Sequence, residues 1–159
     1  MKSPWKDTTT AIGLLVLRLG FGGFMLTHGW GKLQMLLSGD FDQWVDPIGV
    51  GNWLSLAMAT FAEFGCAILV MAGLLTRLAA VPLVVTMIVA AFLVHASDPW
   101  TSGGAAAAFF AGESDFPVAK EPALLYLTAF LALALTGPGR LSIDGLIWRR
   151  DKAMPPAGS

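Results

Sequence analysis

The chain has 159 residues, of which 55% are hydrophobic and only 13% are charged. Soluble domains usually carry about 25% charged residues, so this composition favours lipid over water as the surrounding solvent. The net charge of -1 and the lack of a basic block argue against a nucleic-acid partner, and a single cysteine, Cys66, excludes an internal disulfide or a multi-thiolate metal site.

Four apolar stretches predict membrane-spanning helices, since about 20 apolar residues cross a hydrocarbon core of about 30 Å. In chain order they cover about residues 11–28, 54–75, 78–97 and 122–136. The first contains Arg18 near its middle and no cleavage site follows it, so we expect it to be retained. Only Thr76 and Arg77 separate the second from the third, which predicts a helical hairpin. The fourth is short and ends sharply at residues 137–139.

These spans predict an all-α integral membrane protein, an antiparallel up-down four-helix bundle that forms a single transmembrane domain over residues 1–159. One side of the membrane is expected to hold seven basic residues: Lys2, Lys6, Arg77, Arg140, Arg149, Arg150 and Lys152. The opposite side holds only Lys32 and Lys120. Basic residues in short loops stay in the cytoplasm, so both termini are predicted to be cytoplasmic.

The segments outside the spans also carry apolar side chains. After the last span, residues 141–150 mix apolar and basic residues and predict a short stretch on the inner membrane surface. Two long outer loops, about residues 29–53 and 98–121, contain hydrophobic residues of their own. Long loops of this kind often pack as a cap, and we expect them to cover part of the outer end of the bundle.

Two charged residues fall inside the expected spans. Arg18 lies about midway along the first and Glu63 about midway along the second. Charges in hydrocarbon are costly and usually meet a partner or a cavity, and antiparallel spans bring these two to a similar depth. We therefore predict a buried Arg18–Glu63 ion pair. Desolvation offsets its attraction, so a clamp that fixes helix register and a part in ligand or proton chemistry both stay open.

A second titratable group is expected near the outer membrane face. His28 closes the first span, His95 closes the third and Glu121 opens the fourth. Two histidines and a carboxylate suit either a metal ion or proton transfer near neutral pH, while each histidine alone fits an interfacial residue with a satisfied hydrogen bond. Tyr126 is expected to hydrogen-bond into this group. Cys66 is expected to be a small buried hydrophobe rather than a catalytic thiol.

Several motifs, in this order and spacing, resemble the DoxX family of small bacterial membrane proteins. They are His28-Gly29-Trp30, Lys32-Leu33, Glu63, Gly73-Leu74-Leu75-Thr76-Arg77-Leu78-Ala79-Ala80, Met87, His95, Glu121, Ala123-Leu124-Leu125-Tyr126-Leu127 and Gly137-Pro138-Gly139-Arg140-Leu141-Ser142-Ile143-Asp144. The resemblance covers about residues 14–148 and implies a four-helix bundle in the bacterial inner membrane. It also implies a membrane redox role, because relatives are associated with quinone-linked sulfur oxidation, resistance to oxidative or quinone stress, and complexes with redox enzymes.

The sequence and the resemblance together favour a redox-associated membrane subunit that binds a quinone or a similar apolar molecule in the outer half of the bundle. Arg18, Glu63 and Tyr126 are the expected pocket residues, and His28, His95 and Glu121 are the expected catalytic proton carriers.

The sequence has no haem, flavin or iron–sulfur motif. We therefore expect no tightly bound cofactor, a quinone as the bound ligand, and electrons from a redox protein partner. Membrane lipid is the other expected partner. Two alternatives stay open: a non-enzymatic scaffold for an oxidoreductase, and a small-solute or metal carrier that works as a homo-oligomer with His28, His95 and Glu121 as ligands.

Overall fold

The computed structural model describes residues 4–112 and 118–147, and all regular structure within them is helical, which confirms the all-α class. The helices in chain order are α1 (Pro4–Ser38), η1 (Phe41–Gln43), α2 (Asn52–Thr60), η2 (Phe61–Cys66), α3 (Ala67–Ala72), α4 (Thr76–Val89), η3 (Ala90–Val94), α5 (Ser102–Phe110) and α6 (Glu121–Thr136). Of these, η1 is a short 3-10 helix, and η2 and η3 are wide π-type turns within longer helices.

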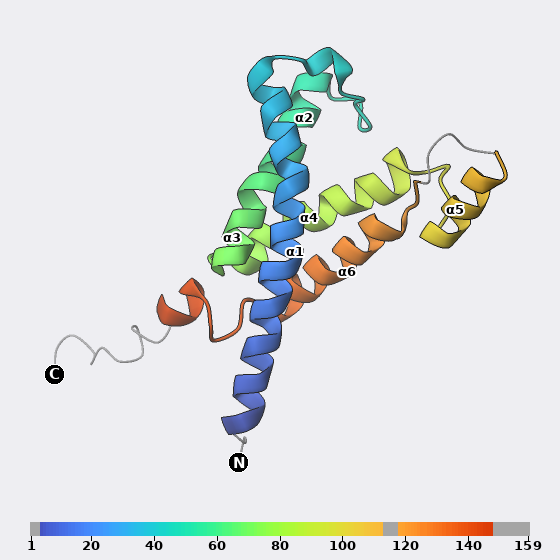
Figure 1. Ribbon diagram of the computed structural model, residues 1–159. Coiled ribbons are helices and arrows are strands. Elements are labelled where there is room, and N and C mark those ends of the chain that lie inside the picture. The colour runs from blue at the N-terminus through green and yellow to red at the C-terminus, as the bar shows by residue number, and fades with distance from the viewer. Residues whose placement is uncertain (1–3, 113–117, 148–159) are drawn as a thin grey trace.

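Two antiparallel helix pairs make up the molecule (Figure 1). In the first pair, α2, η2 and α3 form one continuous helix that returns along α1, and in the second, α4 and η3 run beside α6. The pairs meet where α3 turns into α4, which we call the turn end, and they spread apart towards the opposite loop end, where both long loops lie. The up-down order is as predicted, but the helices form two splayed pairs rather than a closed bundle.

Three helical stretches are long and apolar enough to cross a membrane, judged by length and composition: Thr8–Ser38, Asn52–Ala72 and Thr76–Val94. They confirm the first three predicted spans as long apolar helices. The fourth, α6, has the predicted position, but its 16 residues reach only about 24 Å. Crossing by α6 therefore stays a prediction, as does the cytoplasmic location of both termini.

The first helix is much longer than the sequence pattern indicated. It was expected to end near residue 28, whereas α1 continues to Ser38. Gly29 and Gly31 suggest a loop in the sequence, but Gly29 has a packing role within the helix. A Cβ atom there would lie 2.5 Å from the backbone of Glu63 and Phe64, so only glycine lets α1 and η2 approach this closely. The extension carries Lys32 to a position beside η2.

The turn end is closed by the segment that follows α6. The carboxylate of Asp144 accepts hydrogen bonds from the backbone N–H groups of Leu75 (2.9 Å) and Thr76 (3.2 Å), and so caps the start of α4. The backbone N–H of Asp144 donates to the carbonyl of Gly73 at 3.0 Å. The two glycine-containing motifs that the sequence analysis singled out, around residues 73–80 and 137–144, therefore fold against each other.

The predicted inner-surface segment is described as far as residue 147. Residues 143–147 form one short helical turn, and the side chains of Leu141, Ile143, Leu146 and Ile147 are all exposed. Residues 148–150, which belong to the same prediction, lie outside the described residues. Exposed apolar side chains at this end agree with a stretch that lies on a membrane surface, which stays a prediction.

Candidate functional site

The predicted ion pair between Arg18 and Glu63 is wrong. Arg18 is completely buried at the turn end, where its guanidinium donates to the carbonyls of Met71 (3.3 Å) and Leu141. It also attracts the carboxylate of Asp144 electrostatically. Arg18 therefore ties α1 to α3 and to the segment after α6, which is a structural role.

The register of α1 explains why the two charges do not meet. Gly29 contacts the backbone at Glu63, whereas Arg18 contacts Gly73. Gly29 follows Arg18 by 11 residues, which is about 16 Å along a helix. The sequence argument paired the two charges because it placed both at mid-span. The close contact at Gly29 instead sets Glu63 beside a part of α1 that lies 11 residues beyond Arg18.

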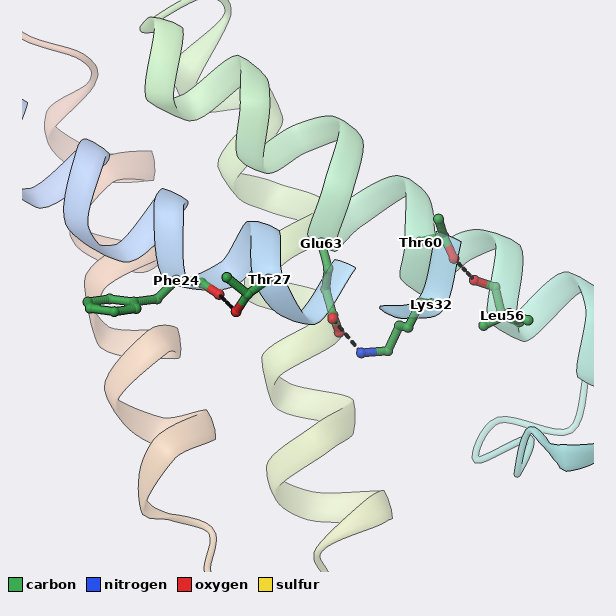
Figure 2. Close-up of polar contacts among 6 residues, drawn as sticks. All are labelled: Phe24, Thr27, Lys32, Leu56, Thr60 and Glu63. Atoms are coloured by element: carbon green, nitrogen blue, oxygen red, sulfur yellow. Dashed lines mark hydrogen bonds and ion pairs between the residues drawn. The ribbon is translucent and has the colours of Figure 1, made fainter. Parts of the chain in front are cut away.

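Glu63 instead forms an ion pair with Lys32 of α1 (Figure 2). The Glu63 side chain is 6% exposed and that of Lys32 is 21% exposed, so the pair lies largely out of water. The hydroxyl of Thr60 does not compete for the carboxylate, because it donates to the Leu56 carbonyl of its own helix at 2.8 Å. A charge that loses its partner in such surroundings is strongly unfavourable, so the two residues hold each other in place.

This ion pair lies in the wall of a pocket of about 620 Å³, which we call the loop-end pocket. The pocket is lined by Lys32, Trp44, Pro47, Ile48, Ser55, Met58, Ala59, Phe61, Ala62, Glu63, Val81, Pro82, Val85, Thr86, Val89, Ala90, Val94 and His95. Most of its walls are apolar, and its few polar groups come from different elements. Pockets of about 300–1,000 Å³ with this character are typical of small-molecule sites.

Both π-type turns contribute to the loop-end pocket. Phe61, Ala62 and Glu63 come from η2, and Ala90 and Val94 come from η3. The backbone N–H of His95 donates to the carbonyl of Ala90 at 2.9 Å, five residues back, which closes η3. Turns of this kind are rare and occur frequently at functional sites. Here residues of both turns line the same pocket.

His95 supplies the pocket with a titratable ring. Its Nδ1 lies 2.6 Å from Oδ2 of Asp98, and both side chains are partly exposed. When the ring is neutral and Nδ1 carries the proton, this contact leaves Nε2 as an acceptor. His95 therefore stands where the pocket meets the water of the loop end and is suited to pass protons between them.

The first long loop covers the pocket. Asp46 accepts hydrogen bonds from the backbone N–H groups of Ile48, Gly49 and Gly51, and these bonds hold the loop in shape. Partial burial opposes the charge of this carboxyl, but the three backbone donors and the hydroxyl of Ser55 together outweigh it and hold its pKa below the usual value. Trp44, from the same loop, donates from Nε1 to the hydroxyl of Ser55 at 3.1 Å and lies in the pocket wall.

The predicted group of His28, His95 and Glu121 does not come together. His28 is exposed and packs edge-on against the ring of Tyr126 (5.9 Å between centroids), and Glu121 accepts a hydrogen bond from the backbone of Ser102 (2.6 Å). Within residues 4–112 and 118–147, no three His, Cys, Asp or Glu side chains are grouped closely enough to hold a metal ion. The geometry therefore does not support the alternative metal site.

Of the predicted site residues, Tyr126 lies near His28 and Glu63. Its ring contacts Phe21 edge-on and stacks on Phe130, and Tyr126 lies close enough to Glu63 to interact with its charge. It lines a different pocket, between α1 and α6.

The sequence analysis did not identify Lys32 as the partner of Glu63, although Lys32 is one of only two basic residues expected on the outer side.

The fold and the pocket define a multi-pass helical membrane protein with a largely apolar site between its helices. A family model for DoxX matches residues 13–96, which is more than half of the chain and includes every residue that lines the loop-end pocket. The chain is also 30% identical over 136 residues to the inner membrane protein YqjF of Escherichia coli (strain K12), a match that covers 86% of this chain and 92% of the relative.

The chain therefore belongs to the DoxX family and is a multi-pass protein of the inner membrane. No solved structure matches it. Of the residues singled out from the sequence, Arg18, His28, Glu63 and His95 fall inside the matched region, and Glu121 and Tyr126 follow it.

Proposed function

We propose that this protein is a redox-associated subunit of the inner membrane that binds a quinone, or a similar apolar ring compound, in the loop-end pocket. The observation that carries the proposal is one largely apolar pocket that contains both the Lys32–Glu63 ion pair and the imidazole of His95. Apolar walls suit the ring and tail of such a compound, and a few convergent polar groups suit its carbonyl oxygens.

The polar groups of the pocket match the hydrogen-bonding needs of a quinone. Carbonyl oxygens accept hydrogen bonds, and the ammonium of Lys32 has three donors, of which Glu63 uses one. Trp44 adds an aromatic face to the wall, and the ammonium of Lys32 lies 5.7 Å from the centre of that ring. The bound head group would lie between the Lys32–Glu63 pair and Trp44.

Reduction of a quinone to a quinol adds two electrons and two protons, one proton to each carbonyl oxygen. In the proposed site, His95 passes protons from the water of the loop end, and Asp98 stabilises the imidazolium that forms. The electrons come from a redox protein partner that docks on this subunit. The chain's own contribution is to bind and orient the ring and to supply protons.

The proposal is tested by quinone binding to the purified protein in lipid nanodiscs. A short-chain ubiquinone is titrated, and quenching of tryptophan fluorescence reports its arrival beside Trp44. Glu63→Gln should raise the dissociation constant about tenfold, because it releases the Lys32 ammonium that donates to the quinone. His95→Ala should raise it by a similar factor, because it removes the imidazole that delivers a proton to a carbonyl oxygen. The control is Asp42→Asn, which neutralises an exposed carboxylate of the same loop that does not line the pocket.

A third variant separates binding from folding. Thr86→Leu adds apolar bulk to the pocket wall without changing a charge, so it should weaken binding while the midpoint of thermal unfolding stays unchanged. No binding to the wild-type protein, or equal binding to the wild type and all three variants, contradicts the proposed site. A scaffold without a ligand site gives the first of these results.

A further inference from the structure

A second apolar pocket lies between the two helix pairs, where α1 and α6 diverge. We call it the α1–α6 groove; it measures about 500 Å³. One wall is a single face of α1 from Gly13 to Phe24, and the other is the first part of α6 together with Ser102. From residue 13 to residue 24 the α1 wall rises about 16 Å. The groove therefore runs along the helices, in the direction in which lipid acyl chains lie in a membrane.

Glycine keeps the α1 wall of the groove open. Cβ atoms built at Gly13 and Gly20 would meet nothing within 4 Å, so these glycines do not serve a close helix contact within this chain. Exposed Val16 and Phe24 lie on the same face of α1. This face therefore offers apolar surface and space, which fits a flexible hydrocarbon chain.

The polar end of the groove carries the carboxylate of Glu121, which forms no ion pair with a basic residue in the part of the chain that the structure describes. Glu121 lines the groove and accepts a hydrogen bond from the backbone N–H of Ser102. Among the described residues of the loop end, both lysines are engaged elsewhere: Lys32 pairs with Glu63, and Lys120 donates to the Ala96 carbonyl (2.7 Å) and lies over the ring of Trp100. A ligand with a positive charge at this point would complement Glu121.

We propose that the α1–α6 groove binds a phospholipid with an ammonium head group, such as phosphatidylethanolamine. Its acyl chain lies along Gly13, Gly20 and Phe24, and its ammonium pairs with Glu121. Tyr126 also lines the groove, and its Cα lies about 7 Å further along α6 than that of Glu121. That depth suits an ester carbonyl of the same lipid.

The experiment is native mass spectrometry of the full chain in detergent with equal amounts of phosphatidylethanolamine and phosphatidylcholine of different chain mass, repeated with the chains exchanged. Both head groups carry a positively charged nitrogen, but the choline nitrogen has no N–H, so the comparison isolates the hydrogen bonds that the ethanolamine ammonium donates to Glu121. The wild-type protein should retain about five times more of the ethanolamine lipid, the net effect of one hydrogen bond. Glu121→Gln should retain both lipids equally.

Two further variants test the groove itself. Gly20→Leu fills it and should abolish retention of both lipids. The matched control Gly31→Leu places the same side chain on the same helix, where a Cβ also meets nothing within 4 Å but which does not line the groove, and it should behave as the wild type.

Equal retention of the two lipids by the wild type, or an unchanged preference in Glu121→Gln, overturns the proposal. The proposal is also overturned if the wild-type protein is a dimer and Gly20→Leu makes it a monomer that still retains lipid. In that case the groove binds a second copy of the chain. Free ethanolamine should leave the thermal unfolding midpoint unchanged, and a rise would show a site for a soluble amine instead. The quinone titration addresses the other pocket, so either proposal can fail alone.

Discussion

Gly73 is the residue on which the turn end depends most directly. Its φ of 72° lies in the left-handed region, and a Cβ added there would lie 2.0 Å from Nη1 of Arg18 and 2.5 Å from Cβ of Ser142. The left-handed conformation costs about 1–2 kcal/mol for a residue with a Cβ, and the displacement of Arg18 adds to this cost. Gly73→Ala should therefore lower the free energy of unfolding by about 3 kcal/mol.

The measurement is unfolding of the purified protein by sodium dodecyl sulfate in mixed micelles, followed by circular dichroism. Gly31→Ala is the control, since position 31 is helical and open, and alanine there should stabilise the helix by about 1 kcal/mol. Equal stability of Gly73→Ala and the wild type would mean that Arg18 and Ser142 do not pack against this position.

At the same scale, the sequence identified which charges matter but not how they pair. Glu63 was recognised as a buried charge that needs a partner, and it has one. The partner is Lys32 rather than Arg18 because pairing depends on the register of two helices, which is set by the close contact at Gly29. No property of an isolated glycine in the sequence distinguishes a helix contact from the start of a loop.

At the scale of elements, the hydrophobic pattern predicted the positions of the long helices but not the π-type turns within them. The stretches at 54–75, 78–97 and 122–136 all correspond to helices within a few residues. The π-type turns η2 and η3 were not predicted, because one extra residue in a turn leaves little trace in an apolar sequence. These turns help to shape the loop-end pocket, so the pocket could not be located from the sequence either.

The contact between α1 and the continuous helix α2–η2–α3 gives a prediction about two glycines of α1, Gly22 and Gly29. A Cβ at Gly29 would meet backbone atoms of η2 at 2.5 Å, whereas a Cβ at Gly22 would meet the side chain of Met71 at 2.6 Å. Backbone cannot move aside without separating the helices, but methionine is flexible. Gly29→Ala should therefore cost about 3 kcal/mol of stability and Gly22→Ala less than about 1 kcal/mol.

The same unfolding assay compares the two alanine variants, and the quinone titration adds a second measurement. Gly29→Ala should also weaken quinone binding, because a shift of η2 moves Glu63 in the pocket wall. Gly22→Ala should bind as the wild type does. If both variants lose the same stability, the backbone contact between α1 and η2 is not the closest point between the helices.

At the scale of the whole molecule, the sequence predicted four helices in an up-down order but not their divergence. Each pair is held internally, α4 against α6 and α1 against α2, η2 and α3, and a core that includes Met25, Leu83, Phe130 and Leu133 joins the pairs. Towards the loop end the space between the helices becomes the two pockets. Hydrophobic periodicity reports which residues avoid water, and in a membrane it does not separate residues that face lipid from residues that face another helix.

The orientation of the molecule and the crossing of α6 can be tested together. Seven basic residues against two favour cytoplasmic termini, and because α6 runs beside α4 (Figure 1) it should reach across the bilayer although it is short. In a Cys66→Ser background, single cysteines at Lys2, Asp42 and Ala153 are treated in spheroplasts with a membrane-impermeant maleimide.

The cysteine at position 42 should react in intact spheroplasts, and those at positions 2 and 153 only after lysis. Reaction at 2 and 153 but not at 42 would reverse the orientation. Reaction at 42 and 153 without reaction at 2 would place the two termini on opposite sides, because three crossings separate the termini while four return them to one face. That pattern would show that α6 does not cross the membrane.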